Sequence, residues 1–236
     1  MKRKIITTAD GSKTIHIEDW NEQYHSKHGA IQEAQHVFIK EGLHHFFSLN
    51  KNCHAEEACA ELSRSIKASI LEIGFGTGLN AFLTLLEAEK LNVKVNYVGV
   101  EAYPVSMQDI NQLNYVELIS VENQTVFNKL HKVSWEKQHH IISNFKLQKR
   151  KQFFLDIADV NAFDLIYFDA FGARVQPELW NKSIFEIMYN ALKPKGILVT
   201  YAAIGEVKRN MQALGFTVER LKGPPGKRHM LRATKK

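Results

Sequence analysis

The chain contains 236 residues, 44% of them hydrophobic and 24% charged, and carries a formal net charge of +6 at pH 7. This composition is typical of a soluble globular protein that forms one sizeable domain or two small ones. No run of about 18 apolar residues is present, which excludes a membrane-spanning helix, and the basic excess is compatible with an anionic partner without proving one.

The sequence offers neither a targeting segment nor a metal site. The basic N-terminus lacks the apolar stretch of a secretory signal, so we expect a cytoplasmic protein. The two cysteines, Cys53 and Cys59, form no CxxC pair. The eleven histidines include no HExxH or other recognised ligand spacing, and we therefore expect no metal.

The N-terminal part of the chain reads as a hairpin followed by helices. Apolar and polar residues alternate around Asp10-Gly11, a strong signal for a hairpin with a two-residue turn. Apolar residues recur at helical spacing between residues 31 and 38, and residues 50–67 are typical of a polar helix. We expect residues 1–67 to be an extension that caps an active site in a domain formed by residues 68–236, the two together forming one compact unit.

From Ser69 onward, strands alternate with helices, which favours a doubly wound α/β sheet with antiparallel strands at one edge. Pro104 and Pro177 stand at the start of two of the helices, and Lys193 to Gly196 read as a helix stop. The sequence predicts strands at 69–74, 95–101, 163–171 and 196–203, helices at 77–91, 104–114, 177–196 and 204–215, and a closing hairpin formed by 216–223 and 228–234.

Three glycines follow the first of these strands. Gly74, Gly76 and Gly78 stand where a strand turns into a helix, which is where backbone approaches a ligand in such sheets. The spacing is not that of a dinucleotide loop, and the lysine of a phosphate-binding loop is absent. A tight turn without any ligand remains the alternative on this motif alone.

Two acidic residues sharpen the interpretation. Glu72 opens an E-x-G-x-G-x-G pattern, and Glu101 stands at the end of the next strand, where a carboxylate can accept hydrogen bonds from two ribose hydroxyls. This is the arrangement of class I methyltransferases, which bind S-adenosylmethionine. Methyl transfer is therefore the leading interpretation, and hydride transfer is second.

Asp169 ends the buried strand at 163–171 and would face the reaction cleft. Methyl transfer to an amine requires an unprotonated nitrogen, so a carboxylate that orients the amine and accepts its proton is useful there. A helix N-cap is the alternative role for this residue.

From Tyr24 to Ala233 the chain resembles the tRNA 5-aminomethyl-2-thiouridine methyltransferase family, of the MnmD and MnmC type. The resemblance is carried, in this order, by "YHSKHGAIQEAQHVFI", "LEIGFGTGLN", "VGVEAYP", "DLIYFDAFGARVQPELW" and "GFTVERLKGPPGKRHML". It implies a Rossmann-like class I fold and methylation of the exocyclic amine of 5-aminomethyl-2-thiouridine at the tRNA wobble position. Larger members carry a flavin-dependent domain, which this chain lacks, so a separate flavoenzyme could act upstream. A methyltransferase for a small-molecule or protein amine, and a silent tRNA-binding relative, are the alternatives.

The resemblance also assigns residues to roles. The family's contact to the cofactor adenine falls on Gln152, or on Asp156 if the loop is shorter. The basic run at 146–151 and the basic tail are candidate phosphate contacts, although either could be a solvated face. The remaining positions are Glu72, Gly74, Phe75, Gly76, Thr77, Gly78 and Glu101 for the cofactor, Asp169, Ala170 and Phe171 at the mouth of the active site, Tyr24, His28, Gln32 and Glu33 over the target base, and Lys227 and Arg228 on a rim that contacts tRNA.

Overall fold

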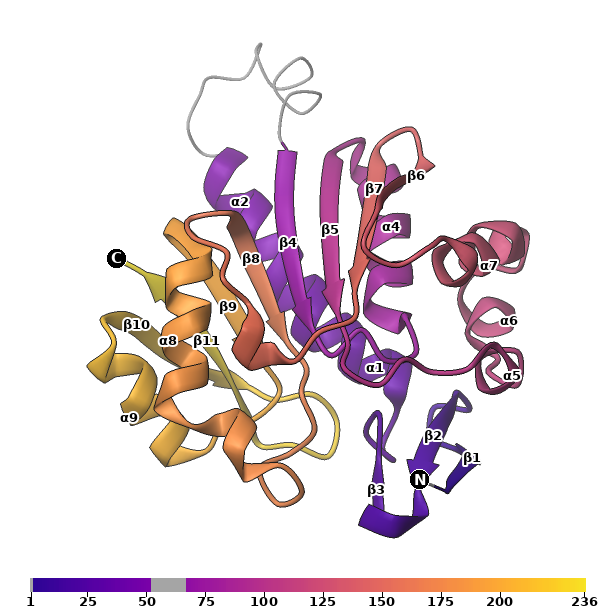
Figure 1. The fold of residues 1–236 in the computed structure, drawn as a ribbon, viewed down its shortest axis with the longest axis horizontal. Helices are drawn as coiled ribbons and strands as arrows, with labels where there is room; N and C mark the ends of the chain where they lie inside the picture. The colour runs from indigo at the N-terminus through magenta and orange to yellow at the C-terminus, as the bar shows by residue number, and fades with distance from the viewer. Residues whose placement is uncertain (1, 52–66) are drawn as a thin grey trace.

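The structure, a computed structural model, describes residues 2–51 and 67–236. Its centre is an eight-stranded sheet with helices on both faces, as Figure 1 shows. Cys53, Cys59 and nearly all of the polar helix expected at 50–67 lie outside the described residues. In spatial order the strands are β10 (Phe216–Lys222), β11 (His229–Lys235), β9 (Leu192–Thr200), β8 (Phe163–Phe168), β4 (Lys67–Ile73), β5 (Lys94–Val100), β7 (Phe145–Arg150) and β6 (Gln138–Ile142).

The strand directions confirm the predicted α/β sheet and the closing hairpin. β4 pairs in parallel with β5 and β8, β5 with β7, and β8 with β9. β11 is antiparallel to both β9 and β10. The chain moves from β4 to β5 on one side and later returns to β8 on the other side. The carboxyl ends of β4, β5 and β8 therefore form a topological switch point, where such sheets bind their ligands.

Two apolar clusters cover the two faces of the sheet. One joins the N-terminal helix and α4 to the sheet, and the other joins α8 and α9 to it. Val37 and Phe38 of the N-terminal helix are buried in the same cluster as Ile70 of β4, so the predicted helix is confirmed and shares a core with the sheet. The division at residue 67 stays a prediction. The helices are α1 (Ala30–Ala34), continued by the π-helical η2 (Gln35–His44) and by α2 (His45–Lys51), then α4 (Leu79–Leu91), α5 (Met107–Ile110), α6 (Tyr115–Ile119), α7 (Gln124–Lys132), α8 (Lys182–Ala191) and α9 (Gly205–Ala213), with short 3₁₀ turns η1 (Glu18–Trp20), η3 (Val121–Asn123), η4 (Phe154–Asp156) and η5 (Pro177–Trp180).

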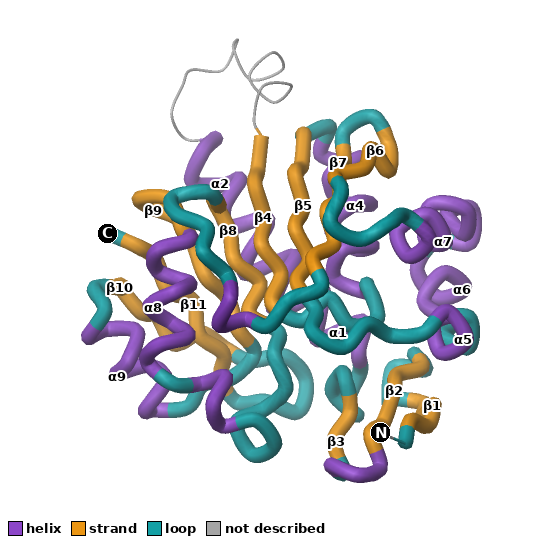
Figure 2. Tube along the Cα trace, viewed as in Figure 1, coloured by secondary structure: helices purple, strands orange, loops and turns teal. Residues whose placement is uncertain are grey.

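A small N-terminal sheet lies beside the carboxyl ends of the parallel strands, next to the loops coloured teal in Figure 2. Its strands are β1 (Arg3–Thr7), β2 (Lys13–Ile17) and β3 (Glu22–Gln23). The hairpin is confirmed, but the expected two-residue turn is wrong. Asp10 organises a longer loop, because its Oδ1 accepts hydrogen bonds from the hydroxyls of Thr8 at 2.7 Å and Ser12 at 2.5 Å.

The helix expected at 177–196 ends earlier than its stop signal. It divides into η5 and α8, and α8 ends at Ala191. Lys193 to Gly196 belong to β9, because Pro194 has no amide hydrogen and cannot continue a helix. The helix expected at 104–114 is likewise shorter, since Ser106 caps α5 by accepting a hydrogen bond from the Asp109 amide.

Of the basic run at 146–151, Lys149 is neither part of a solvated face nor placed to contact a phosphate, whereas Lys151 is exposed and stays a candidate for either role. Residues 145–150 form β7, and β6 pairs with it to give a second antiparallel edge that the sequence reading missed. Lys149 is buried at 2% exposure, and its Nζ donates to the His131 carbonyl at 2.6 Å. Burial lowers the pKa of Lys149 to about 8.

Gly99 of β5 fixes the position of an aromatic ring behind the glycine loop. A Cβ at Gly99 would lie 3.0 Å from Cγ of Phe75 and closer still to its ring edge. Phe75 is 3% exposed and packs edge-on against His131 and Trp135. A side chain at position 99 would therefore push Phe75 out of its place.

We expect Gly99→Ala to lower the free energy of unfolding by about 1–3 kcal/mol, because it overpacks a buried site. Urea unfolding followed by circular dichroism measures this. Gly205→Ala is the matched control, since its added methyl group comes no closer than 3.4 Å to the Arg209 side chain. Equal stability of the two variants would contradict the role given to Gly99.

Candidate active site

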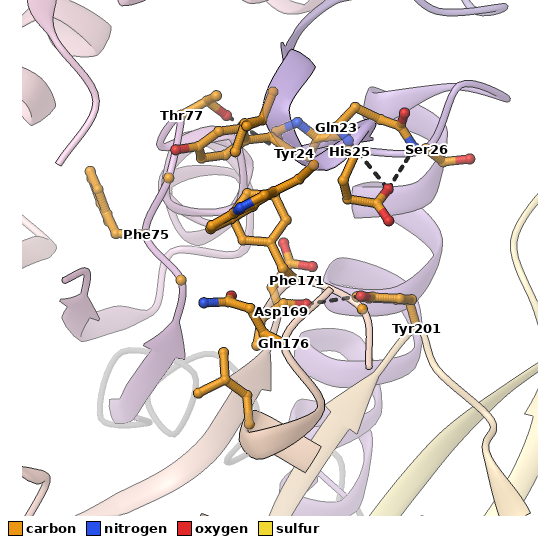
Figure 3. A pocket seen from close by; sticks show the side chains of 18 of the residues that line it. Gln23, Tyr24, His25, Ser26, Phe75, Thr77, Asp169, Phe171, Gln176 and Tyr201 are labelled. Atoms are coloured by element: carbon orange, nitrogen blue, oxygen red, sulfur yellow. Dashed lines mark hydrogen bonds between the residues drawn. The ribbon is translucent and has the colours of Figure 1, made fainter. Parts of the chain in front are cut away.

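A cavity of about 910 Å³ lies at the switch point, between the carboxyl ends of the strands and the N-terminal segment. Its walls come from the residues after β4, β5, β8 and β9 and from the chain between β2 and α1 (Figure 3). The residues predicted from the sequence that line it are Tyr24, His28, Glu33, Glu72, Gly74, Phe75, Gly76, Thr77, Glu101, Asp169, Ala170, Phe171 and Lys227.

The other predicted residues lie elsewhere. Gly78 precedes α4 and packs against His131, and the amide of Gln32 donates to Asp10. Arg228 is exposed. Neither candidate for the adenine contact, Gln152 or Asp156, is among the described residues that line the cavity; the segment between them, 153–155, takes that place.

The glycine loop brings backbone to the floor of the cavity. Gly74 has a φ of +88°, and a Cβ there would lie 2.8 Å from the carbonyl oxygen of Asp169. Only glycine combines that conformation with such a close approach. Gly76 follows under the ring of Tyr24. The loop therefore leaves room for a ligand between β4 and the N-terminal segment.

Glu101 presents a fixed carboxyl group at the end of β5. Its Oε2 accepts a hydrogen bond from the Gly76 amide at 3.0 Å, and its Oε1 accepts one from the Tyr103 amide at 2.9 Å. The side chain is buried, which raises its pKa. Each oxygen retains acceptor capacity, so the group is suited to a pair of hydroxyls such as those of a ribose.

The buried carboxyl group of Glu72 and the half-buried carboxyl group of Asp169 share one amide donor. Asn80 of α4 donates through Nδ2 to Oε1 of Glu72 and to Oδ2 of Asp169, both at 2.9 Å. Burial raises the pKa of Glu72 well above its usual range. Burial and the charge of Glu33 raise the pKa of Asp169 to about 7, against the opposing effects of Asn80 and Lys227. Asp169 therefore exchanges a proton near neutral pH.

A cation lies on the other side of Asp169. The Nζ of Lys227 is 2.5 Å from Oε2 of Glu33 and 3.7 Å from the centroid of the Tyr201 ring. The Tyr201 hydroxyl donates to the carbonyl of Ala170, next to Asp169, at 2.9 Å. The sequence reading placed Lys227 on the rim, whereas the structure puts its ammonium group inside the cavity.

Aromatic rings and one arginine hold the N-terminal segment over the cavity. Phe171 makes edge-to-face contacts with Trp20 at 5.5 Å and Tyr24 at 4.9 Å between ring centroids. Arg174 donates to the carbonyls of Trp20 at 3.3 Å and Asn21 at 3.0 Å. This side of the cavity is therefore aromatic.

Several of these residues were not singled out from the sequence. Asn80 stands inside a quoted motif, but Trp20 and Arg174 gain their meaning from long-range contacts alone. His25 is half-buried, with Nδ1 3.0 Å from the Thr14 hydroxyl, and desolvation lowers its pKa to about 4, so it is neutral. Tyr201 directly follows β9. Its position after a predicted strand was the signal that could have identified it as a site residue.

Among the described residues, no cluster of three His, Cys, Asp or Glu side chains could hold a metal ion. In the same ranges, 2–51 and 67–236, no helix combines the length and apolar character that crossing a membrane needs.

The raised pKa of Asp169 predicts a pH-dependent stability. A carboxyl group with a folded-state pKa above its unfolded value favours the fold when protonated and loses that contribution as the pH rises through the folded pKa, here from about 4 to about 7. We expect Asp169→Asn to gain stability relative to the native protein between about pH 5 and about pH 8. Urea unfolding at both pH values measures it; parallel changes in the two proteins would contradict the shift.

The sequence of the chain is similar to those of known proteins. Residues 124–236 match the profile of a family described as S-adenosyl-L-methionine-dependent methyltransferases. The chain is 28% identical to the "tRNA 5-methylaminomethyl-2-thiouridine biosynthesis bifunctional protein MnmC" of Idiomarina loihiensis, over 88% of this chain and 34% of that protein. It is also 28% identical to MnmC of Delftia acidovorans, over 99% of this chain and 35% of that protein. The chain spans about a third of the length of these curated relatives.

Solved structures agree on the fold. The crystal structure of MnmC2 from Aquifex aeolicus matches with a TM-score of 0.70 and 22% identity, over 100% of this chain and 71% of that chain. Spermidine synthase from Thermotoga maritima matches with a TM-score of 0.50 and 12% identity, over 99% of this chain and 73% of that chain.

The cavity fits S-adenosyl-L-methionine, the cofactor of this family. Gly74 leaves space that a side chain would fill, and Glu101 offers two carboxylate oxygens for ribose hydroxyls. The loop carries no lysine for a phosphate, which this cofactor lacks. In its sequence, its fold and its site, the chain is similar to the MnmC-related S-adenosyl-L-methionine-dependent methyltransferases.

Proposed function

We propose that the protein methylates the primary amine of 5-aminomethyl-2-thiouridine at the wobble position of tRNA and forms 5-methylaminomethyl-2-thiouridine. The name of the MnmC relatives, which concerns biosynthesis of that product in tRNA, supports the substrate. The observation that carries the proposal is Asp169, a half-buried carboxyl group at the switch point that is held by Asn80 and has a pKa raised to about 7.

S-adenosyl-L-methionine supplies an electrophilic methyl group when it is bound. On the protein side, Glu101 would hold the ribose and the backbone at Gly74 and Gly76 would line the opposite side of the cofactor. Phe153 and Phe154, which line the cavity, would face the adenine in place of the expected Gln152 or Asp156.

Asp169 would prepare the substrate amine. A primary amine has a pKa near 10 and arrives as an ammonium ion, which has no lone pair and cannot attack. An ordinary aspartate, with a pKa near 4, is a weak acceptor for that proton. At a pKa of about 7, Asp169 is a better base, and it still carries negative charge at neutral pH to bind the ammonium. Asn80 holds its Oδ2, so the carboxyl group keeps one orientation.

The aromatic side of the cavity suits a base that has left its stack. Phe171, Trp20 and Tyr24 present ring faces and edges within one small region. Enzymes that act on a nucleobase hold it between such side chains and leave the backbone outside. Exposed cations near the mouth, Arg228 and Lys27, would then contact phosphates. A separate flavoenzyme that provides the amine stays a prediction.

The direct experiment incubates the protein with methyl-labelled S-adenosylmethionine and tRNA that lacks only this methyl group. We expect the label in 5-methylaminomethyl-2-thiouridine after nucleoside digestion. Asp169→Asn should lower turnover by about 10²–10⁴-fold, as for other lost acid–base groups, while calorimetry shows retained cofactor binding. Native turnover in Asp169→Asn would make Asp169 structural. Labelling of a small amine but not of tRNA would replace the proposed substrate.

Arg228 tests the contact with nucleic acid. Its neutralisation in Arg228→Gln should weaken tRNA binding and reduce the slope of log affinity against log salt by roughly 0.7–0.9, the value for one phosphate contact. Lys90→Gln is the matched control, because Lys90 is exposed near the end of α4 that points away from the cavity. A salt slope that Arg228→Gln leaves unchanged would move the tRNA surface elsewhere.

A further inference from the structure

Lys227 lines the cavity, but the proposed function assigns it no role. Its side chain is 29% exposed and lines the cavity, so its ammonium group is poorly placed for a phosphate on the outside of a tRNA. Its neighbours are the carboxylate of Glu33 and the face of Tyr201. Both neighbours stabilise a cation, one by charge and one by the ring quadrupole.

The loop that carries Lys227 is held in one place. Gly223 donates to the carbonyl of Arg228 at 3.1 Å, and the Lys227 amide donates to the carbonyl of Pro224 at 2.9 Å. His28 packs its ring against Gly226. Because the backbone is anchored on both sides, the ammonium group is positioned by the fold as well as by its partners.

We propose that Lys227 is a positioning residue for methyl transfer: by pairing with Glu33 across the face of Tyr201, it cancels the charge of Glu33 and keeps Asp169 available as the proton acceptor for the substrate amine. This inference rests on the proposed function. The proton balance is simple: the ammonium proton passes to the Asp169 carboxylate, and the nitrogen lone pair that remains is free to attack.

Charged and titratable groups from several elements bear on Asp169. They are Glu72 from β4, Tyr97 from β5, Glu33 from α1, Tyr115 from α6, Tyr201 directly after β9, and Lys227 from the loop between β10 and β11. Glu33 raises the pKa of Asp169 and Lys227 lowers it. With the cation removed, Glu33 would stand uncompensated beside Asp169, and Asp169 would hold its proton to a higher pH.

The pairing also separates two carboxyl groups that would otherwise compete. Glu33 is buried, and its Oε1 accepts a hydrogen bond from the Ser26 amide at 3.3 Å while its Oε2 pairs with Lys227. Both oxygens of Glu33 are thus engaged within the chain, which leaves Asp169 as the carboxyl group available to the substrate proton.

The test is the pH dependence of kcat/KM in variants that change this pair. In Lys227→Met, we expect the rising limb of the profile to move up by about one pH unit, so that the rate near pH 7 falls about tenfold and recovers at higher pH. Glu33→Gln should move the limb down, and the double variant Lys227→Met/Glu33→Gln should return it close to the native position. Lys227→Arg keeps the charge and should keep the limb.

Lys90→Met is the matched control, since it removes one positive charge from the end of α4 that points away from the cavity and should leave the limb where it is. A Lys227→Met profile with an unchanged limb, a higher KM for tRNA and a smaller salt slope would overturn the inference and make Lys227 a phosphate contact.

A second readout does not need the tRNA. Carbon-13 NMR of labelled aspartate carboxyl groups, with the Asp169 signal assigned by its loss in Asp169→Asn, gives the titration midpoint of Asp169 directly. We expect a higher midpoint in Lys227→Met. If that midpoint rises but the native enzyme labels no tRNA, the coupling of Lys227 to Asp169 stands and the proposed substrate fails. An unmoved midpoint overturns the role of Lys227 whatever the substrate is.

Discussion

The site depends on the side-chain amide of Asn80, which donates hydrogen bonds to the carboxyl groups of both Glu72 and Asp169. Asn80 joins Glu72, at the end of β4, to Asp169, just beyond β8, and these two strands are neighbours at the switch point. Ionising both carboxyl groups costs more free energy than ionising one of them, because like charges repel and the site is shielded from bulk water. The shared donor stabilises charge on the pair without adding a positive charge of its own. The acidity of the site is thus set by sheet geometry, because the parallel pairing of β4 with β8 brings the two acids together.

The sheet supplies one half of the cavity and the N-terminal segment supplies the other. Glu101, Asp169 and Tyr201 all follow strands, which makes their positions as rigid as the sheet. Tyr24, His28 and Glu33 come from a part of the chain that precedes the sheet entirely. Because the N-terminal helix shares the core of the sheet, this part is tied to the same framework. Methyl donor and acceptor would therefore meet between two elements of one packed unit.

Much of the framework could be predicted from the sequence, because its signals are local. Apolar runs marked β4, β5 and β8, and the spacing of Val37 and Phe38 marked the N-terminal helix. Lys149 shows the limit of interpreting charge alone. It lies two residues after Leu147 and four after Phe145, on the same buried face of β7. The period of two therefore indicated a buried position, but the basic composition of the segment suggested an exposed one. Pro194 is a similar case. The sequence reading took Lys193 to Gly196 as the last turn of a helix, whereas these residues belong to β9 because Pro194 cannot continue a helix.

The candidate site was predictable where one motif supplies it and less so where distant segments meet. The glycine loop and Glu101 follow from their place after a strand. The position of Lys227 depends on a turn, a helix and a strand end that meet only in the folded chain, so the pattern of basic residues suggested the rim instead. The segment at 152–156 shows the same limit, since Phe153 and Phe154 line the cavity whereas the sequence reading chose their polar neighbours Gln152 and Asp156.

Arg174 has a consequence for how this protein can vary. Its side chain donates hydrogen bonds to the main-chain carbonyls of Trp20 and Asn21, in the N-terminal segment over the cavity. A main-chain carbonyl is the same acceptor in every amino acid. These two hydrogen bonds therefore do not depend on which side chains stand at positions 20 and 21, whereas the third, from Arg174 to the Glu22 carboxylate at 2.9 Å, requires an acceptor side chain. A substitution at position 20 or 21 would leave both main-chain hydrogen bonds in place, so this part of the attachment can persist while those side chains vary.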